Sequence, residues 1–71
     1  MKTFYTTNGV YTGETLDGKM HGLGLLVYDS GDVYFGDFES HEKHGEGILI
    51  FCVGTILRGM FDEGLCTGYS I

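Results

Sequence analysis

Apolar and polar positions alternate along short stretches of this chain, and turn-forming residues separate the stretches. Between Val33 and Phe38, for example, Tyr34, Gly36 and Phe38 occupy every second position. Successive side chains of a β-strand point to opposite faces, so this alternation predicts strands, and no helical period competes with it. The predicted strands cover approximately residues 3–6, 10–16, 23–28, 33–39, 46–52, 55–61 and 68–70.

The segments between these strands are rich in Gly, Asp, Asn and Ser, which favour turns. They are TNG at 7–9, LDGKMHG at 16–22, DSGD at 29–32, VGT at 53–55 and FDEGLCTG at 61–68. Short turns join antiparallel neighbours, so we expect an all-β fold, a single-layer antiparallel meander of stacked β-hairpins. With strands about 4.8 Å apart, this elongated, twisted sheet should measure about 30 Å along its repeat axis.

The pattern itself repeats every 23 residues. The aligned columns keep their chemistry, as these sets show: Tyr5, Tyr28 and Phe51; Tyr11, Tyr34 and Leu57; Gly13, Gly36 and Gly59; Gly22, Gly45 and Gly68. A fixed period of this length is typical of repeat proteins. We therefore predict one domain at residues 3–71, with repeats at about 11–33, 34–56 and 57–71 after an N-terminal half-repeat at 3–10.

The recurring glycines need a physical reason, because glycine weakens a strand by about 0.5–1 kcal/mol relative to alanine. They leave the same position of each copy without a side chain on the face that carries Tyr11, Tyr34, Phe38 and Phe61. We expect these rings to lie in the space that the glycines leave open. The glycines should also let a single-layer sheet curve around the rings.

Two stretches carry a resemblance to a known family. YTGETLDGKMHGLG at 11–24 and YFGDFESHEKHGEG at 34–47 each open with Tyr-x-Gly and end with His-Gly-x-Gly. At their 23-residue spacing they resemble MORN repeats, and the resemblance covers about residues 3–71. It implies stacked hairpins with a groove lined by Tyr and Gly positions, which holds partner peptides or helices. It also implies dimerisation and no catalytic machinery in the repeat, while lipid association is attributed to some members.

Several positions depart from the MORN pattern. Thr15 stands where the other copies have phenylalanine, so the first copy should have a shallower groove. His41 replaces a turn glycine that the other copies keep at Gly18 and Gly64, a change that histidine tolerates because it adopts positive φ more readily than most residues. The last copy departs at three family positions, as a capping repeat does. These are Leu57, Thr67 and Ser70.

A further departure is a second apolar face. The positions that alternate with the aromatic ones are apolar rather than polar, and by parity they point to the opposite side of the sheet. We predict that this face binds a second copy of the chain. Its residues are Leu23, Leu25, Val27, Phe35, Ile48 and Ile50, with Ile56 and Met60 on the same side. The alternative is that bulges in the YDSGDVY turn at 28–34 shift the parity and return some of these side chains to a single core.

Composition narrows the partners and the compartment. Ten acidic and four basic residues give a net charge of −6, which opposes nucleic acid and disfavours anionic membrane lipid as a partner. Cys52 and Cys66 form neither a disulfide framework nor a zinc motif, so we expect reduced thiols in the cytoplasm. The chain begins without a secretory signal, and no apolar run approaches the about 20 residues of a membrane helix.

No group of residues predicts catalysis, a metal or a cofactor. His21 and His44 share a column but should lie about 10 Å apart, too far to share a metal ion. The acidic turns lack the spacing of a calcium loop, and the glycines lack the lysine and helix of a phosphate loop. Neither cysteine has a His–Asp pair to activate it. The sequence therefore predicts a protein that is not an enzyme and binds no cofactor.

The function that these observations favour is a scaffold or protein–protein interaction module. We expect a peptide or helix of a partner to bind the groove through rings that the repeat already holds rigid, which limits the entropy lost on binding. The chain should also self-associate. The alternative is a peripheral membrane module that binds phospholipid. The predicted groove consists of Tyr11, Gly13, Tyr28, Tyr34, Gly36, Phe38, Phe51 and Phe61.

Overall fold

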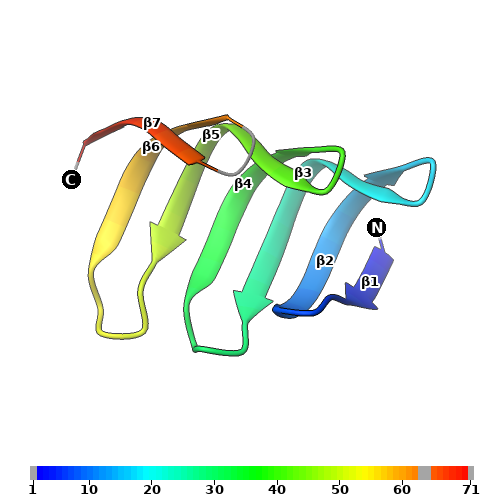
Figure 1. Cartoon of the computed structure of the whole chain (residues 1–71), viewed down its shortest axis with the longest axis horizontal. Helices are drawn as coiled ribbons and strands as arrows, with labels where there is room; N and C mark the ends of the chain where they lie inside the picture. The colour runs from blue at the N-terminus through cyan, green and yellow to red at the C-terminus, as the bar shows by residue number, and fades with distance from the viewer. Residues whose placement is uncertain (1, 63–64, 71) are drawn as a thin grey trace.

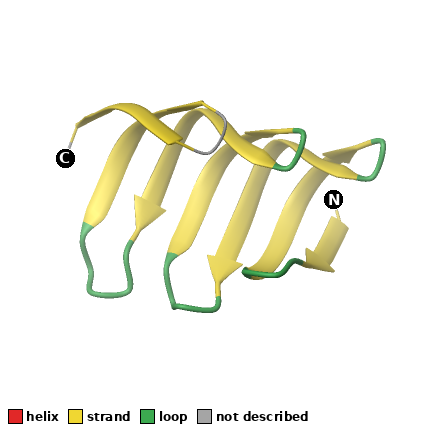
Figure 2. Cartoon of the chain, viewed as in Figure 1, coloured by secondary structure: helices red, strands yellow, loops and turns green. Residues whose placement is uncertain are grey.

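The protein is one antiparallel β-sheet whose strands follow each other in space in the order of the chain (Figures 1 and 2). The computed structural model describes residues 2–62 and 65–70, with the side chains of residues 2, 3 and 5–62. Its strands are β1 (Lys2–Tyr5), β2 (Gly9–Leu16), β3 (Lys19–Tyr28), β4 (Val33–Glu39), β5 (Glu42–Ile50), β6 (Ile56–Asp62) and β7 (Leu65–Ser70). The predicted all-β meander is confirmed. Among the described residues, no helix is long and apolar enough to cross a membrane.

Predictions for a few C-terminal positions lie outside the described part of the chain. They concern Gly64 and the side chains of Cys66, Thr67 and Ser70. The backbone of residues 65–70 is described, and it forms the strand that pairs with β6.

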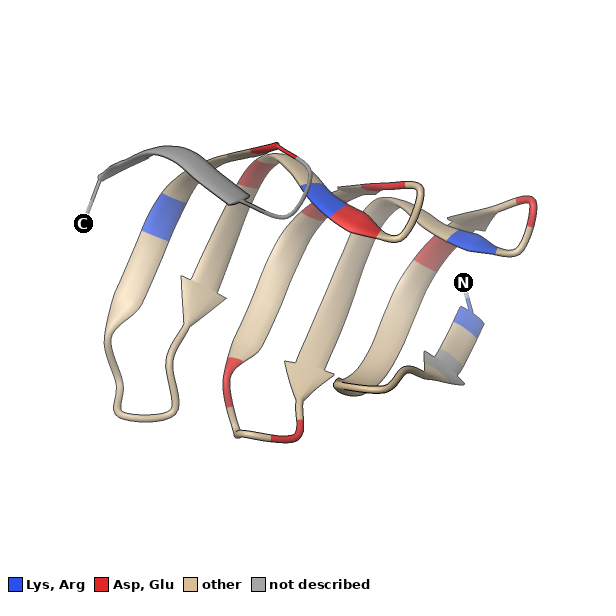
Figure 3. Ribbon diagram, in the orientation of Figure 1, with Lys and Arg blue, Asp and Glu red and all other residues tan. Residues whose placement is uncertain are grey.

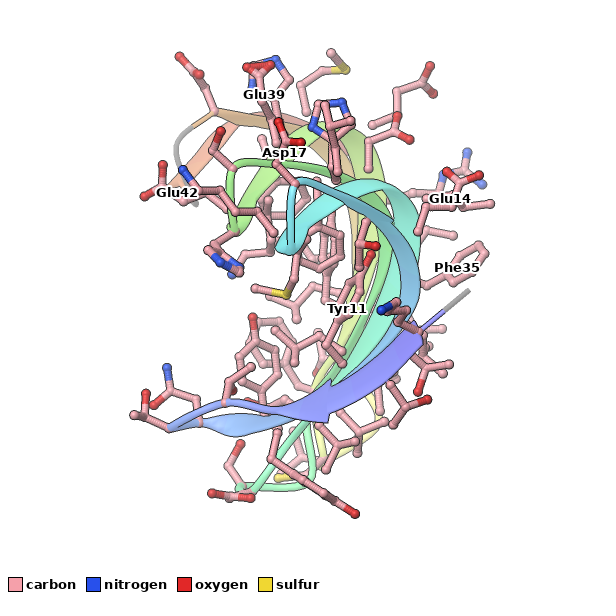
Figure 4. The ribbon with its side chains drawn as sticks, turned by 90° about the vertical axis from the view of Figure 1, so that its right-hand side faces the viewer. Tyr11, Glu14, Asp17, Phe35, Glu39 and Glu42 are labelled. Atoms are coloured by element: carbon pink, nitrogen blue, oxygen red, sulfur yellow. The ribbon has the colours of Figure 1, made fainter. Side chains whose placement is uncertain are left out.

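The strands stack along the longest dimension of the molecule, which measures 33 × 22 × 17 Å. Each long strand bends partway, so the sheet curls around one of its faces, as the end-on view in Figure 4 shows. The register shifts between Gly13 and Thr15 in β2 and between Gly36 and Phe38 in β4. The sheet thus has a concave side, inside the curl, which contains Tyr11. Its convex side, outside the curl, carries Phe35 and Glu14 (Figure 4).

Glycines of the two His-Gly-x-Gly motifs form the bend. Opposite the two register shifts, Gly22 and Gly45 have φ of +75° and +71°. Side chains strongly disfavour this left-handed region, whereas glycine adopts it readily. The expectation that glycines permit curvature therefore holds at two defined positions.

The hairpin turns at the bent end are tighter than the sequence predicted. β3 and β5 begin at Lys19 and Glu42, four residues before the predicted starts at 23 and 46. The predicted seven-residue turn at 16–22 is wrong because Asp17–Gly18 makes the reversal alone, with φ of 53° and 77°. Ser40–His41 makes the equivalent turn with φ of 49° and 73°, so the substitution of histidine for the turn glycine is accommodated as expected. Positive φ at both central residues is the type I′ geometry that suits a hairpin.

The core is a line of aromatic rings on the concave side. Phe38 meets Tyr11 and Tyr34 edge to face, with ring centroids 5.1 and 5.2 Å apart, and Phe61 meets Tyr34 in the same way at 5.1 Å. Such pairs contribute about 0.5–1.5 kcal/mol each beyond the area they bury. Because the Tyr11–Phe38 and Tyr34–Phe61 pairs each join two different repeats, the line of rings ties the repeats together.

The buried tyrosines rest directly on glycines. A Cβ atom added to Gly24 would collide with the ring of Tyr11, and one added to Gly47 would collide with the ring of Tyr34. Gly13 and Gly36 likewise lie under the phenol oxygens of these two rings. The rings thus occupy the space that the glycines leave open, as the repeat pattern indicated.

Candidate functional site

The predicted groove residues divide into a buried core and a partly exposed rim. Tyr11 and Tyr34 are 0% exposed, Phe38 and Phe61 are also buried, and Gly13 and Gly36 lie beneath the tyrosine rings. Tyr28 and Phe51 are partly buried. The four central rings therefore pack against one another as the core. A partner on the concave side would contact the partly exposed residues around them, such as Tyr28 and Phe51.

A depression of about 480 Å³ opens on the concave side, between the β4–β5 hairpin and the turn that joins β1 to β2. We call it the concave depression. Its apolar floor and walls are Met20, Leu26, Tyr28 and Phe38. Its rim consists of Tyr5, Thr6, Thr7, Asn8, His41, Glu42 and Lys43. Apolar walls with a few polar groups at the edge are the usual composition of a binding site.

Lys43 places a positive charge inside this depression. Its Nζ atom donates a hydrogen bond to the hydroxyl of Tyr28 at 2.8 Å. The same atom lies 5.4 Å from the ring centroid of Tyr28 and 5.6 Å from that of Tyr34. Both rings attract a cation through their faces, so the ammonium group is held in position. A lysine fixed in this way presents one charge to an incoming acidic group.

Sequence reasoning placed Tyr28 and Phe38 in the groove but missed Met20, Leu26 and Lys43. Met20 and Lys43 share a repeat column that was assigned to a turn, and the early start of β3 and β5 puts both on the concave face. Met20 is buried and Lys43 partly buried. The inward orientation of Leu26 could have been predicted from the alternation of side chains, because Leu26 lies between two outward-facing positions of β3.

The tyrosine hydroxyls serve the structure rather than chemistry. The hydroxyl of Tyr34 donates to the backbone oxygen of Asp37 at 3.0 Å, and that of Tyr11 donates to the backbone oxygen of Glu14. Burial raises the pKa of Tyr34 to about 12, with the Asp37 carboxylate adding to the effect, and burial also raises the pKa of Tyr11. Both phenols therefore stay protonated at neutral pH and fix the bend of their own strands.

The convex side carries two rows of apolar side chains across the sheet. In the first row, Leu25 pairs with Phe35 and Phe35 with Ile48. The second row is wholly aliphatic and runs from β2 to β6: Val10, Val27, Val33, Ile50 and Ile56. With Leu23 and Met60 these residues form what we call the convex apolar face. Phe35 is 45% exposed and projects outward in Figure 4.

The register excludes the slipped parity that was the alternative for these residues. The register shifts of β2 with β3 and β4 with β5 lie at the bend and not in the turn at 28–34. None of the predicted self-association residues belongs to the buried cluster. Those residues are Leu23, Leu25, Val27, Phe35, Ile48 and Ile50, of which Leu25 and Ile48 are partly buried and the rest exposed. Both faces of the sheet are therefore apolar.

Charges are arranged around the convex apolar face. Figure 3 shows acidic residues toward the bent ends and the turns, with the middle of β3 to β5 free of charge. Arg58 extends the first apolar row on β6, opposite Ile48. Glu14 lies on the same side of β2, two positions from Thr12 at the other end of that row. A shallow hollow of about 600 Å³ lies mainly over β4 to β6. Its lining includes the apolar side chains of Leu23, Phe35, Ile48 and Met60 and the charged side chains of Asp37, Glu46 and Arg58.

The histidines at the bent end make polar contacts between hairpins. His44 lies 3.8 Å from Glu39 on β4 and 3.5 Å from Asp62 on β6. The Nδ1 atom of His41 accepts a hydrogen bond from the backbone nitrogen of Met20 at 3.2 Å, which links two repeats. Within the described residues, no three His, Cys, Asp or Glu side chains are placed to hold a metal ion.

Comparison with known proteins agrees with the repeat pattern. The family model described as MORN repeat matches residues 11–33 and 34–56. A search of curated proteins finds no match. The matched segments contain both tyrosine–glycine units of the core and both glycine bends.

Proposed function

Because the chain belongs to the MORN-repeat family, whose modules are typically non-catalytic, we propose that it is a non-catalytic scaffold module that binds a partner protein. The observation that carries this proposal is the concave depression with Lys43 fixed at its rim. The site presents an apolar surface, the positioned ammonium group of Lys43 and the carboxylate of Glu42 on the rim. It contains no pairing of nucleophile, base and acid that would support a reaction.

The chemistry of the depression defines the partner segment. Met20, Leu26 and Phe38 form a floor that suits apolar side chains, and the walls are held by the sheet, so little entropy is lost on binding. Lys43 favours a carboxylate in the segment. An amphipathic helix or an extended peptide with apolar anchors and one acidic residue meets both requirements.

Peptide selection tests this proposal. A displayed library of random peptides is panned on the protein, and the affinities of the selected peptides are measured by fluorescence anisotropy for the wild type and for variants. We expect sequences that combine apolar anchors with an acidic residue, and a loss of affinity of about 10-fold or more in Lys43→Glu. Lys19→Glu is the matched control, because Lys19 is exposed and does not line the depression, and should change affinity less than about 2-fold.

Two results would contradict the proposal. If Lys43→Glu and Tyr28→Ala both bind the selected peptides with the affinity of the wild type, the peptides bind elsewhere on the protein. Salt-sensitive cosedimentation with anionic liposomes would favour the peripheral membrane alternative, which the net charge of −6 opposes.

A further inference from the structure

We propose that the convex apolar face binds one amphipathic helix of a partner protein, which lies across β2 to β6 and carries lysine or arginine along one flank. This site is on the side of the sheet opposite the concave depression, so it goes beyond the proposed function, and either proposal can fail without the other. The shape of the hollow on this face, the charges beside it and the pairing of the strands beneath it point to this occupant.

The hollow on the convex side crosses the strands and does not follow any one of them. Its floor is bare backbone at Gly36, Gly47 and Gly59, which pair in register on β4, β5 and β6. Phe35 and Ile48 of the first apolar row form one of its walls. The five strands from β2 to β6 span about 19 Å, which is the length of about 13 residues of helix. A rod-shaped segment therefore fits this narrow strip better than a flat surface does.

Exposed carboxylates border the strip on the side of the bend. Glu14, on the convex side in Figure 4, and Asp37 occupy the same position of consecutive repeats, and Glu46 lies on the strand next to Asp37. Asp37 and Glu46 line the hollow, and within the described part of the chain neither of them forms an ion pair. Glu14 and Asp37 lie two strands apart, about 10 Å, and seven residues of helix advance about 10.5 Å. Basic residues seven positions apart on one flank of a helix therefore reach both carboxylates.

Arg58 on β6 carries the opposite charge and sets the direction of the helix. It pairs with Ile48 at the end of the first apolar row, and it also lines the hollow. An acidic residue of the helix suits this end, whereas basic residues suit the part that lies over β2 to β5. Complementary charges fix the orientation of an association more than they increase its affinity.

The face of a sheet requires a segment that satisfies its own backbone. Each of the strands β2 to β6 pairs with a neighbour on both sides, so the face offers a partner side chains only. An extended peptide buried there would leave its N–H and C=O groups without partners, whereas a helix pairs them internally. Apolar residues along one side of the helix then contact Leu25, Phe35 and Ile48.

The same charges disfavour the other occupants that an apolar face attracts. A second copy presents the same carboxylates on its matching face, and the chain has four basic residues against ten acidic ones. Anionic lipid is repelled by these carboxylates. A basic helix is attracted both by them and by the net charge of −6. Because the strip is narrow, the interface is of the small, transient kind, and we expect a dissociation constant of about 10 μM.

Two synthetic helices of about 18 residues test the chemistry of the face. Both peptides carry leucine along one side, and the flank beside it carries lysine in the first peptide and glutamate in its charge-reversed twin. We expect the full chain to bind the lysine peptide at least about 10-fold more tightly than the twin at about 0.15 M salt, as measured by fluorescence anisotropy. Equal affinities, or no binding of the lysine peptide up to about 1 mM, overturn the proposal.

Matched charge variants separate the local carboxylates from the net charge. Asp37→Asn combined with Glu46→Gln removes two charges from the hollow and should weaken binding of the lysine peptide about 10-fold. Asp17→Asn combined with Asp29→Asn removes the same charge from exposed turns outside the hollow and should change the affinity less than about 2-fold. Equal weakening by the two pairs would mean that the net charge alone attracts the peptide, and overturns the site. Far-ultraviolet circular dichroism shows that each variant remains folded.

Nuclear magnetic resonance of side-chain methyl groups identifies the face that binds and needs no variant. The methyl signals of Leu25 and Ile48 on the convex side should shift when the lysine peptide is added, whereas those of Met20 and Leu26 in the concave depression should not. Shifts at Met20 and Leu26 in place of these overturn the convex site and leave the proposed function to its own test. Sedimentation equilibrium of the protein alone covers the remaining occupant. A dimer at micromolar concentration that Phe35→Asp dissociates would assign the face to a second copy and overturn the proposal.

Discussion

Each buried tyrosine of this protein forms one unit with the glycines beneath it and the bend beyond it. The ring of Tyr34 lies on Gly36 and Gly47, and its hydroxyl donates to the backbone oxygen of Asp37 at the register shift of β4. Tyr11 makes the equivalent contacts with Gly13, Gly24 and Glu14. The recurrence of Tyr-x-Gly in the sequence therefore reflects a single packing requirement, in which the ring needs bare backbone and the bend needs the hydroxyl.

The phenol of Tyr34 makes stability depend on pH in the alkaline range. Its folded pKa of about 12 lies above the value of about 10 in an unfolded chain, because burial disfavours the phenolate. The folded state thus holds the proton more tightly. Its contribution is complete below pH 10 and is lost as the pH rises through 10 to 12, by about 2 to 3 kcal/mol in total.

Tyr34→Phe should remove this part of the pH dependence. At pH 7 the variant should lose about 1 kcal/mol with the hydrogen bond to Asp37, and its unfolding free energy should fall less steeply than that of the wild type above pH 10. Urea unfolding across this pH range measures both effects. Tyr5→Phe is the control, because Tyr5 is 82% exposed and should leave the pH dependence unchanged. Equal slopes in Tyr34→Phe and the wild type would show that the Tyr34 phenol does not titrate as described.

At the scale of elements, the two complete hairpins at the bent end have the same geometry but different sequences. Asp17–Gly18 has a glycine at its second central position, whereas Ser40–His41 has positive φ at two residues that carry side chains. Side chains in this region cost about 1–2 kcal/mol each. The β4–β5 hairpin therefore has two side chains in this region, whereas the β2–β3 hairpin has one, that of Asp17. The hydrogen bond from Met20 to His41 offsets part of the additional cost.

Ser40→Asn should stabilise the protein by about 0.5–1 kcal/mol, because asparagine adopts positive φ at the first central position of a type I′ turn more readily than serine. Chemical denaturation at fixed protein concentration measures the gain. Ser30→Asn is the matched control, since Ser30 lies in a turn but is not among the described residues with positive φ. A similar gain in both variants would mean that the effect comes from asparagine itself and not from the turn.

These elements also show how far the sequence could predict the fold. The alternation of side chains identified the strands, and it identified the two faces of β2 to β6, because the period of two persists in these strands outside the bend. The starts of β3 and β5 could not be predicted in this way, since Gly22 and Gly45 interrupt the alternation where the strand bends. Turn propensity then assigned Met20 and Lys43 to loops, and the wall and charge of the concave depression went unrecognised with them.

The convex apolar face could be predicted from the sequence, whereas the division of the aromatic residues into core and binding surface could not. Parity placed Phe35 and the other outward residues on the convex side, and no tertiary contact had to be known for that. Whether an aromatic ring is a binding surface or a core depends on its neighbours across repeats. Tyr11 and Phe38 are 27 positions apart in the chain yet meet at 5.1 Å, which no local pattern reveals.

At the scale of the whole molecule, aromatic contacts between repeats join the hairpins into one cooperative structure. A repeat protein is stabilised by each unit and by the contacts between neighbours. Phe38 contacts both Tyr11 and Tyr34, and so connects β2 with β4, whereas Phe61 contacts Tyr34 among the described rings. Loss of Phe38, in the middle of the line, should therefore destabilise more strands than loss of Phe61, near its end.

Phe38→Leu should cost about 1 kcal/mol more than Phe61→Leu, since it removes two edge-to-face contacts and not one. Native-state hydrogen exchange should locate the difference. In Phe38→Leu the amides of β2 and β3 should exchange faster together with those of β4 and β5, because the contact between the two repeats is weakened. In Phe61→Leu the increase should be confined to β5 and β6. Equal acceleration over all strands in both variants would instead mean that the sheet opens only as a whole, and that its stability does not divide among the repeats.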